Sequence, residues 1–395
     1  MADPSPAARL HTSVWMLGLV SMLTDISSEM VSGLLPVFLV TQLAVSASTI
    51  GLIEGAACAV TMLVKAFSGS LSDYLGRRKP LVLLGYGLSA AAKPLLAAAG
   101  SVSLIASARL MDRTGKGMRD APRDALIADI TPESLRGAAY GLRQALDTVG
   151  AFVGPLLAMG LMLLWANDYR AVFWVATIPA VLALLLLYVG VREPVVADRK
   201  RLQNPITRAN LRQLRASYWW LVALGAGLTL ARFSEAFLVL RAQQDGLPLA
   251  WTPLVLIAMN LVYAGLAYPF GQWSDRLHPR LLLGASLLVL MGAHGLLAHG
   301  GLGVWAGIVL WGLHMAMAQG LMSALVANAA PDHLRGTAFG LFNVVSGLIL
   351  LVASALAGYL WDSLGASAPF AAGAAFAALT LVLLLIQPQG SSQTH

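Results

Sequence analysis

The feature that most constrains this chain is a run of charged residues inside an apolar segment, between Ser101 and Asp129. On an ideal helix, at about 100° per residue, the charges fall within an arc of roughly 140°. They are Arg109, Asp112, Arg113, Lys116, Arg119, Asp120, Arg123 and Asp124. The opposite arc is apolar apart from one hydroxyl and holds Leu110, Met111, Thr114, Met118, Ala121 and Ala125. A charge at the centre of a bilayer costs about 2.5–3.5 kcal/mol even on a mild scale, so these side chains must face protein partners or a water-filled cavity.

Two interpretations of this charged face are open. A solvated cytoplasmic helix suits Arg123 and Asp124, where Pro122 also interrupts the backbone hydrogen bonds. A cavity wall suits the residues from Arg109 to Lys116, because the apolar residues 102–110 place them at membrane depth. The second interpretation is favoured.

The rest of the chain is apolar over its whole length. Of its 395 residues, 58% are hydrophobic and 11% are charged, whereas a soluble domain carries about 25% charged residues. This deficit predicts a polytopic membrane protein. The net charge of +7 does not indicate nucleic-acid binding, because the basic residues concentrate in short loops between apolar segments. The single cysteine, Cys58, excludes a disulfide within the chain.

Twelve apolar segments are long enough to cross about 30 Å of hydrocarbon. They cover approximately residues 13–40, 48–71, 80–99, 102–127, 138–165, 170–190, 217–240, 250–273, 281–299, 303–329, 337–361 and 367–387. We therefore expect an all-α membrane protein with twelve transmembrane helices. The first segment is too long for a signal peptide and contains Asp25 and Glu29, so we expect it to be retained as the first span.

Basic residues are distributed unevenly over the loops. One set of alternate loops holds Arg77, Arg78, Lys79, Arg136, Arg276, Arg280 and Arg335, together with seven basic residues in the segment 191–216. The other set holds only Arg170 and Arg241. The positive-inside rule therefore predicts that both termini are cytoplasmic, in a membrane of the bacterial inner-membrane type.

Three sequence landmarks recur in the same order in the two halves of the chain. They are Gly69–Asp73 with Gly271–Asp275, at an offset of 275 − 73 = 202, Pro132–Leu142 with Pro331–Leu341, at an offset of 331 − 132 = 199, and Ser28-Glu29 with Ser234-Glu235. We expect two six-helix bundles, residues 1–190 and 217–395, joined by a cytoplasmic linker at 191–216. Two such parallel repeats, with a site near the midplane between them, are a known transporter plan.

The first copy of one landmark, Gly69-x-Leu71-x-Asp73-x-x-Gly76-Arg77-Arg78-Lys79, lies in the predicted loop between spans 2 and 3. It resembles the loop signature of the major facilitator superfamily, and the twelve spans and the degenerate second copy fit that family. The resemblance implies a transporter rather than an enzyme. It also implies that this loop is a latch between the two halves in the outward-facing state. The implied gate residues are Gly69, Asp73, Gly76, Arg77, Arg78 and Asp275. The second copy departs from the signature at residues 278–280, which predicts a weaker latch there.

Two further motifs bear on the same resemblance. Arg109 occupies the arginine position of the family's span-4 motif, although Asp112 and Arg113 replace the glutamine and glycine that usually follow. In span 5, Gly150-x-x-x-Gly154-Pro155 resembles the motif associated with antiporters. Its physical content is a glycine face for close packing and a proline-softened hinge, although ordinary helix packing also uses such faces.

Asp25 and Glu29 lie one turn apart on the first span. Carboxylates in a partly dry cavity can accept protons, and a nearby arginine can alternately pair with them and release them. We therefore predict Asp25 and Glu29 as proton-accepting groups and Arg109 as their switching partner. Arg143 and Asp147, at i,i+4 on span 5, are interpreted as a structural ion pair.

The remaining intramembrane polar and aromatic residues are predicted to line the substrate cavity. They are Glu54, Lys65, Lys93, Asp112, Arg113 and Lys116 in the first half and Arg232, Glu235, Asn260, Trp311 and His314 in the second. One wall would be charged and the other aromatic and methionine-rich, which favours an amphiphilic substrate. No metal-ligand spacing is present in the sequence.

The sequence thus favours a monomeric proton antiporter that exports a small organic compound, driven by the proton gradient without a cofactor. Its partners would be the substrate and the lipid bilayer, with no nucleic acid. An importer or exchanger of an anionic metabolite or metal chelate is the alternative, favoured by the five basic against three acidic residues of the charged face. A membrane-embedded sensor or enzyme would need a nucleophile–base pair or an appended soluble domain, and the sequence offers neither.

Overall fold

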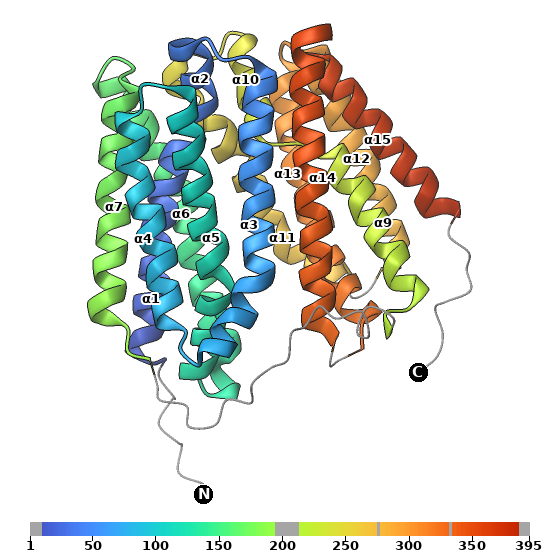
Figure 1. Cartoon of the computed structure of the whole chain (residues 1–395). Coiled ribbons are helices and arrows are strands. Elements are labelled where there is room, and N and C mark those ends of the chain that lie inside the picture. Colours follow the sequence, from blue (N-terminus) through green and yellow to red (C-terminus); the bar gives the residue numbers. More distant parts are fainter. Residues whose placement is uncertain (1–9, 194–212, 275–276, 332–333, 387–395) are drawn as a thin grey trace, which may run out of the picture. The chain divides into compact units, whose positions relative to one another are not determined.

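The computed structural model describes residues 10–193, 213–274, 277–331 and 334–386. Every regular element in these ranges is helical (Figure 1). The all-α prediction is therefore confirmed. Asp275, one of the predicted gate residues, and most of the predicted linker lie outside the described residues.

Eleven helical segments within the described ranges are long and apolar enough to cross a membrane. Their helices are α1 (Thr12–Ser32) followed by α2 (Leu35–Leu43), α3 (Ala47–Leu75), α4 (Lys79–Ala98), α6 (Arg136–Leu164), α7 (Tyr169–Gly190), α9 (Ala216–Ala231) followed by α10 (Ala236–Gln244), α11 (Pro253–Ser274), α12 (Pro279–His299), α13 (Gly303–Ala329), α14 (Arg335–Leu364) and α15 (Ala368–Ile386). The remaining predicted span is α5 (Val102–Ile130), a continuous 29-residue helix that carries the charged face. Because of its charged residues, α5 is less apolar than the eleven segments above.

Helix α5 begins where the Ser101 side chain accepts a hydrogen bond from the amide of Leu104, at 3.3 Å. The charged face is buried as far as Arg119 and Arg123, which are 3% and 7% exposed. A solvated last turn was one of the two interpretations of the sequence, and for Arg123 it is wrong. Burial of Arg123 is possible because neighbouring helices supply polar partners, which a sequence pattern does not reveal.

The chain forms two compact units. The first unit consists of the described residues up to Val31 and of residues 67–193. The second consists of Ser32–Ala66 and of the described residues from 213 onward. Helix α3 is continuous but divides between them at Ala66. The predicted boundary between two halves at 191–216 remains a prediction. Within the second unit, α2 packs against α10 and the first part of α3 packs against α14.

Two spans are interrupted in the middle. The break between α1 and α2 lies at Gly33 and Leu34, and the break between α9 and α10 lies at residues 232–235. At the second break, the freed carbonyl of Ala231 accepts a hydrogen bond from His294 Nε2 at 2.9 Å. This hydrogen bond satisfies a backbone carbonyl that an interrupted helix would otherwise leave unpaired in hydrocarbon.

Candidate functional site

The two predicted proton-accepting groups lie on α1 in the first unit. Asp25 and Glu29 are half-buried, and neither has a hydrogen bond or an ion pair among the described residues. The charged groups that act on Asp25 are, in order of strength, Lys116, Asp147, Glu29 and Arg119. Lys116 is the strongest of these charges, and the role predicted for Arg109 as switching partner stays a prediction.

The glycine face of α6 packs directly against the carboxylate-bearing turns of α1. A methyl group added at Gly150 would lie 2.6 Å from the carbonyl oxygen of Met22 and 2.9 Å from Cβ of Asp25. The same addition at Gly154 would lie 2.7 Å from the carbonyl oxygen of Ile26 and 2.9 Å from Cβ of Glu29. Only glycine fits these positions, so the span-5 motif fixes where both carboxylates lie. Pro155 follows inside the same buried stretch of α6; its role as a hinge stays a prediction.

A buried ion cluster lies beside these carboxylates. Lys93 Nζ on α4 lies 3.2 Å from Asp112 Oδ1 on α5, and Arg109 Nη1 lies 3.9 Å from Asp112 Oδ2. The exposed fractions of the three side chains are 3%, 8% and 4%. Lys93 also donates to Ser28 Oγ at 3.3 Å, on the turn of α1 between Asp25 and Glu29. The cluster therefore ties α4 and α5 to the carboxylate-bearing segment.

Close packing of α4 on α5 places this cluster. A methyl group at Gly85 would lie 2.7 Å from the carbonyl oxygen of Gly115, and the reverse contact is closer still. Ser89 Oγ donates to the carbonyl oxygen of Asp112 at 3.1 Å, and Ser68 Oγ on α3 donates to that of Gly117 at 2.9 Å. The glycines on either side of Lys116 therefore serve helix packing.

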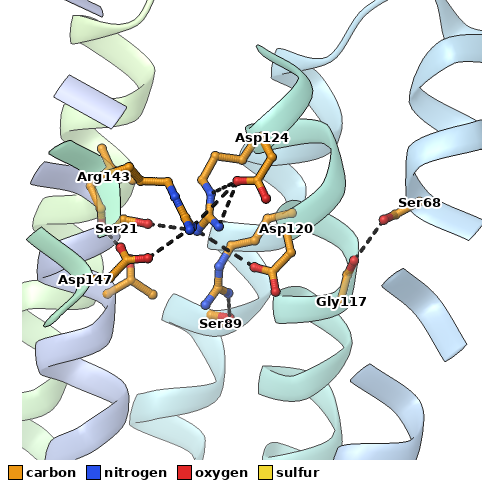
Figure 2. A network of polar contacts seen from close by, with 12 residues as sticks. Ser21, Ser68, Ser89, Gly117, Asp120, Asp124, Arg143 and Asp147 are labelled. Carbon is orange, nitrogen blue, oxygen red and sulfur yellow. Dashed lines mark hydrogen bonds and ion pairs between the residues drawn. The ribbon is translucent and has the colours of Figure 1, made fainter. Parts of the chain in front are cut away.

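A second polar network begins one turn further along α5 (Figure 2). The Arg123 guanidinium donates to Ser21 Oγ at 2.8 Å and lies 3.8 Å from Asp120 and 3.1 Å from Asp124. Arg143 on α6 lies 3.7 Å from Asp124 and 3.0 Å from Asp147, so the predicted pairing of Arg143 with Asp147 is confirmed. Figure 2 shows Arg143 between these two carboxylates, joining α5 to α6.

Sequence reasoning named Arg119 and Asp147 but missed Ser21, Ser89 and Tyr86, which complete this network. Arg119 donates to Ser89 Oγ at 2.5 Å, and its guanidinium carbon lies 4.7 Å above the ring of Tyr86. The negative charge of Asp147 also acts on Asp25. The signal for Arg119 was its place on the charged arc of α5; the serines and Tyr86 carried no signal that distinguishes them from other residues of apolar helices.

The loop between α3 and α4 has the geometry of a closed turn. Gly76 ends α3 at a φ of +66°, a conformation that favours glycine. Arg78, rather than Arg77, closes the loop: its guanidinium lies 2.9 Å from Asp73 and 2.6 Å from Asp129 at the end of α5. Arg77 is exposed.

Two further residues anchor the elements on either side of this loop. Glu193 accepts hydrogen bonds from the first amides of α4, at Arg78 and Lys79. On the other side, Gly69 of α3 faces Ala121 of α5, where an added methyl group would make an ordinary contact of 3.5 Å with Cβ.

The predicted cavity residues divide between the units. The first unit holds Lys93, Asp112, Arg113 and Lys116, and the second holds Glu54, Lys65, Arg232, Glu235, Asn260, Trp311 and His314. In the second unit Trp311 and His314 are fully buried. His314 Nδ1 donates to the carbonyl oxygen of Ser286 at 2.8 Å, and Trp311 packs edge-on against His294 with ring centroids 5.4 Å apart.

The other predicted residues of the second unit differ in exposure. Arg232 lies in the α9–α10 break, where Glu235 and Tyr263 act on its charge. Glu54 is buried, Asn260 half-buried and Lys65 exposed. In this unit Arg232 and Glu235 lie at a helix break, whereas Glu54 and Lys65 lie on α3.

Comparison with known proteins decides the family. The model of the Major Facilitator Superfamily matches residues 17–354. The chain belongs to the Major Facilitator Superfamily. It is 32% identical, over 95% of both chains, to an uncharacterized MFS-type transporter of Methanocaldococcus jannaschii. It is 26% identical to the multidrug resistance protein MdtH of Yersinia enterocolitica, over 72% of this chain and 71% of that one.

The fold agrees with this assignment. The crystal structure of a D-xylose–proton symporter superposes with a TM-score of 0.75, covering 97% of this chain and 99% of that one at 15% sequence identity. This MFS protein is accordingly a multi-pass membrane transporter of small molecules and not an enzyme. Transporters of this superfamily generally need no cofactor.

Proposed function

We propose that this MFS transporter is a proton antiporter that exports a small organic compound, with Asp25 and Glu29 as the proton-accepting groups. The observation that carries the proposal is the contrast between these two half-buried carboxylates, which have no ion pair among the described residues, and Asp112, which Lys93 holds at 3.2 Å. An ion-paired carboxylate is kept charged, whereas an unpaired one can exchange a proton with its surroundings. A carrier needs such a group inside the membrane.

Lys116 takes the switching role that was predicted for Arg109. It is the strongest charged neighbour of Asp25, and among the described residues its ammonium group has no ion pair closer than 4 Å. When a proton neutralises Asp25, Lys116 loses its anionic neighbour and becomes available to a polar group of the substrate. When Asp25 releases the proton, Lys116 returns to the carboxylate. Arg109, held by Asp112, would supply a constant positive charge beside this exchange.

The wider assignment follows the sequence. The charged wall of Arg109, Arg113 and Lys116 would face the polar part of an amphiphilic substrate, and Arg232, Glu235 and Asn260 of the second unit are proposed as further substrate contacts. The carrier would work as a monomer in a bacterial-type inner membrane with both termini in the cytoplasm, as the distribution of basic loops indicates. The similarity to a protein named for multidrug resistance supports export of an organic compound.

Transport assays in proteoliposomes test the coupling. With an imposed pH gradient, the wild-type protein should accumulate an exported compound from a metabolite and drug panel. Asp25→Asn or Glu29→Gln, whichever removes the proton carrier, should abolish this accumulation but keep energy-independent counterflow. Glu133→Gln is the matched control, because the Glu133 side chain is 88% exposed and pairs only with Arg136 among the described residues. If both variants still accumulate the compound, the proton assignment is wrong.

Import or exchange of an anionic metabolite or metal chelate is the second candidate. Its specific support is the set of four cations, Lys93, Arg113, Arg109 and Arg119, that act on the single carboxylate of Asp112. The same proteoliposomes distinguish the two functions. Counterflow of anions alone, independent of the pH gradient, favours exchange; a compound-induced proton flux favours antiport.

A further inference from the structure

The N-terminus of α3 is capped by a carboxylate that lies far away in the sequence. Asp362, in the last turn of α14, accepts hydrogen bonds from the amides of Ala47 and Ser48 at 3.0 and 2.8 Å, and from Ser48 Oγ at 2.5 Å. The first amides of a helix have no partner within the helix and attract negative charge. One carboxylate therefore joins the start of α3 to the end of α14.

Below this cap, α3 and α14 meet backbone to backbone. A methyl group at Gly55 would lie 3.0 Å from Cα of Leu351, and one at Gly347 would lie 3.0 Å from Cβ of Met62. Two closer contacts of the same kind are those of Gly51 with the carbonyl oxygen of Ser354 and of Gly358 with that of Ala47. These four glycine contacts between α3 and α14 form what we call the glycine seam. At about 1.5 Å per residue, the seam extends over roughly 20 Å of α3.

The seam continues into the broken span. Ser354, opposite Gly51, also accepts a hydrogen bond from the amide of Ser234 in the α9–α10 break, at 3.1 Å. Nearby, Gly33 in the α1–α2 break packs against Pro253, with 3.1 Å between a methyl group built at Gly33 and Cα of Pro253. This end of the second unit is thus closed by segments from both predicted halves of the chain.

The opposite end of α3 differs. There the predicted latch carboxylate, Asp73, pairs with Arg78 of its own loop. The resemblance to the superfamily implies that Asp73 latches the carrier in its outward-facing state. In this structure it is Asp362, at the other end of α3, that is engaged with a helix N-terminus.

We propose that Asp362 is a second gate residue, which locks the glycine seam at the external end and must release Ala47 and Ser48 before that end opens. The inference rests on the proposed orientation and on alternating access, but it needs neither a proton nor an identified substrate. A cap that only stabilised α3 would hold in every state of the carrier. A gate residue has a different consequence, because its loss should expose the seam from one side of the membrane.

The native cysteine reports on the seam. Cys58 is the only cysteine of the chain, is half-buried and lies on α3 between Gly55 and Ala59, both of which contact α14. Its rate of reaction with a charged, membrane-impermeant thiol reagent can be measured in right-side-out and in inverted membrane vesicles. For the wild-type protein we expect slow reaction from the external side.

Asp362→Ala should raise the external rate roughly three- to tenfold, as expected for the loss of a helix cap that biases a two-state equilibrium. Ser48→Ala, which removes one of the three hydrogen bonds, should raise it less. The matched control is Asp168→Ala: Asp168 caps α7 by accepting from the amide of Ala171 at 3.0 Å. The control should leave the rate at Cys58 unchanged.

Three outcomes would overturn the proposal. The first is an unchanged external rate in Asp362→Ala, and the second is an equal rise in Asp168→Ala. The third is an equal rise from both sides of the membrane, which would indicate general loosening of the fold. Size-exclusion profiles of the purified variants show whether each one is folded. Failure of proton antiport would not affect this measurement, so the two proposals can fail separately.

Discussion

Helices α5 and α13 occupy equivalent places in the two repeats, and the comparison between them shows what the repeats have kept and what they have changed. At the offset of 199 residues, the eight charged positions of α5 correspond to Ile308, Trp311, Gly312, Met315, Ala318, Gln319, Met322 and Ser323 of α13. Six of these eight, all except Gln319 and Ser323, are buried, as are Arg109, Asp112, Arg119 and Arg123 on α5. The helices therefore share a buried face but fill it with opposite chemistry.

The way these faces are packed is similar. On α5, Gly115 lies against the backbone of Gly85 on α4. On α13, a methyl group added at Gly312 would lie 2.5 Å from the carbonyl oxygen of Met259 on α11. Close approach of backbones is therefore common to both units. Among the described residues, the first unit holds the larger set of buried charges neutralised by one another, and this makes it the more fragile of the two.

The largest expected effect tests that fragility. Asp112→Ala should destabilise the protein by about 3–5 kcal/mol, because it leaves Lys93 buried and uncompensated. Thermal unfolding in detergent measures the change. The double variant Lys93→Met/Asp112→Leu should recover part of the loss, since it removes the closest ion pair but leaves Arg109 without this carboxylate.

The matched change in the second unit is Trp311→Phe, at the equivalent position. Trp311 Nε1 is buried without a hydrogen-bond partner among the described residues, so replacement by an aromatic ring without this donor should cost less than the loss of Asp112. Equal losses at the two positions would mean that buried charge does not distinguish the units.

The sequence was sufficient to predict the helices and the charged face, because hydropathy, charge periodicity and the repeat are local properties of the chain. It also identified Asp25, Glu29 and the glycines of α6 as separate features. It could not show that Gly150 and Gly154 contact the turns that carry these two carboxylates, because that depends on which helices pack together. For the same reason it did not identify Lys116 as the strongest charged neighbour of Asp25, and it gave no sign that Asp362 reaches α3.

A smaller effect is expected where the first unit uses glycine rather than charge. Gly154→Ala should displace the turn of α1 that carries Glu29, at a cost of about 1–3 kcal/mol from overpacking. If the carboxylates act in transport, the initial rate in proteoliposomes should fall more than the stability loss accounts for. Gly160→Ala, on the same helix with nothing within 4 Å of the added methyl group, is the control and should behave as wild type. Equal behaviour of the two variants would remove the link between the glycine face and the carboxylates.

The smallest effect concerns the loop that carries the family signature. Arg78→Ala removes the ion pairs to Asp73 and Asp129. Because these carboxylates are 24% and 21% exposed, solvent screens the pairs, and we expect a loss of about 1 kcal/mol. Arg77→Ala, at an exposed position of the same loop, should stay within about 0.5 kcal/mol of wild type.

Thermal unfolding of the two loop variants therefore ranks the two arginines of one motif by their contacts. In the second unit, the His278 ring at the start of α12 accepts a hydrogen bond from the amide of Arg280 at 3.3 Å. If Arg77→Ala is the more damaging variant, the loop must change partners in another state of the carrier. In that state Arg77 would have to take the place that Arg78 holds here, and the difference between the two repeats at this loop would then belong to the transport cycle rather than to the stability of the fold.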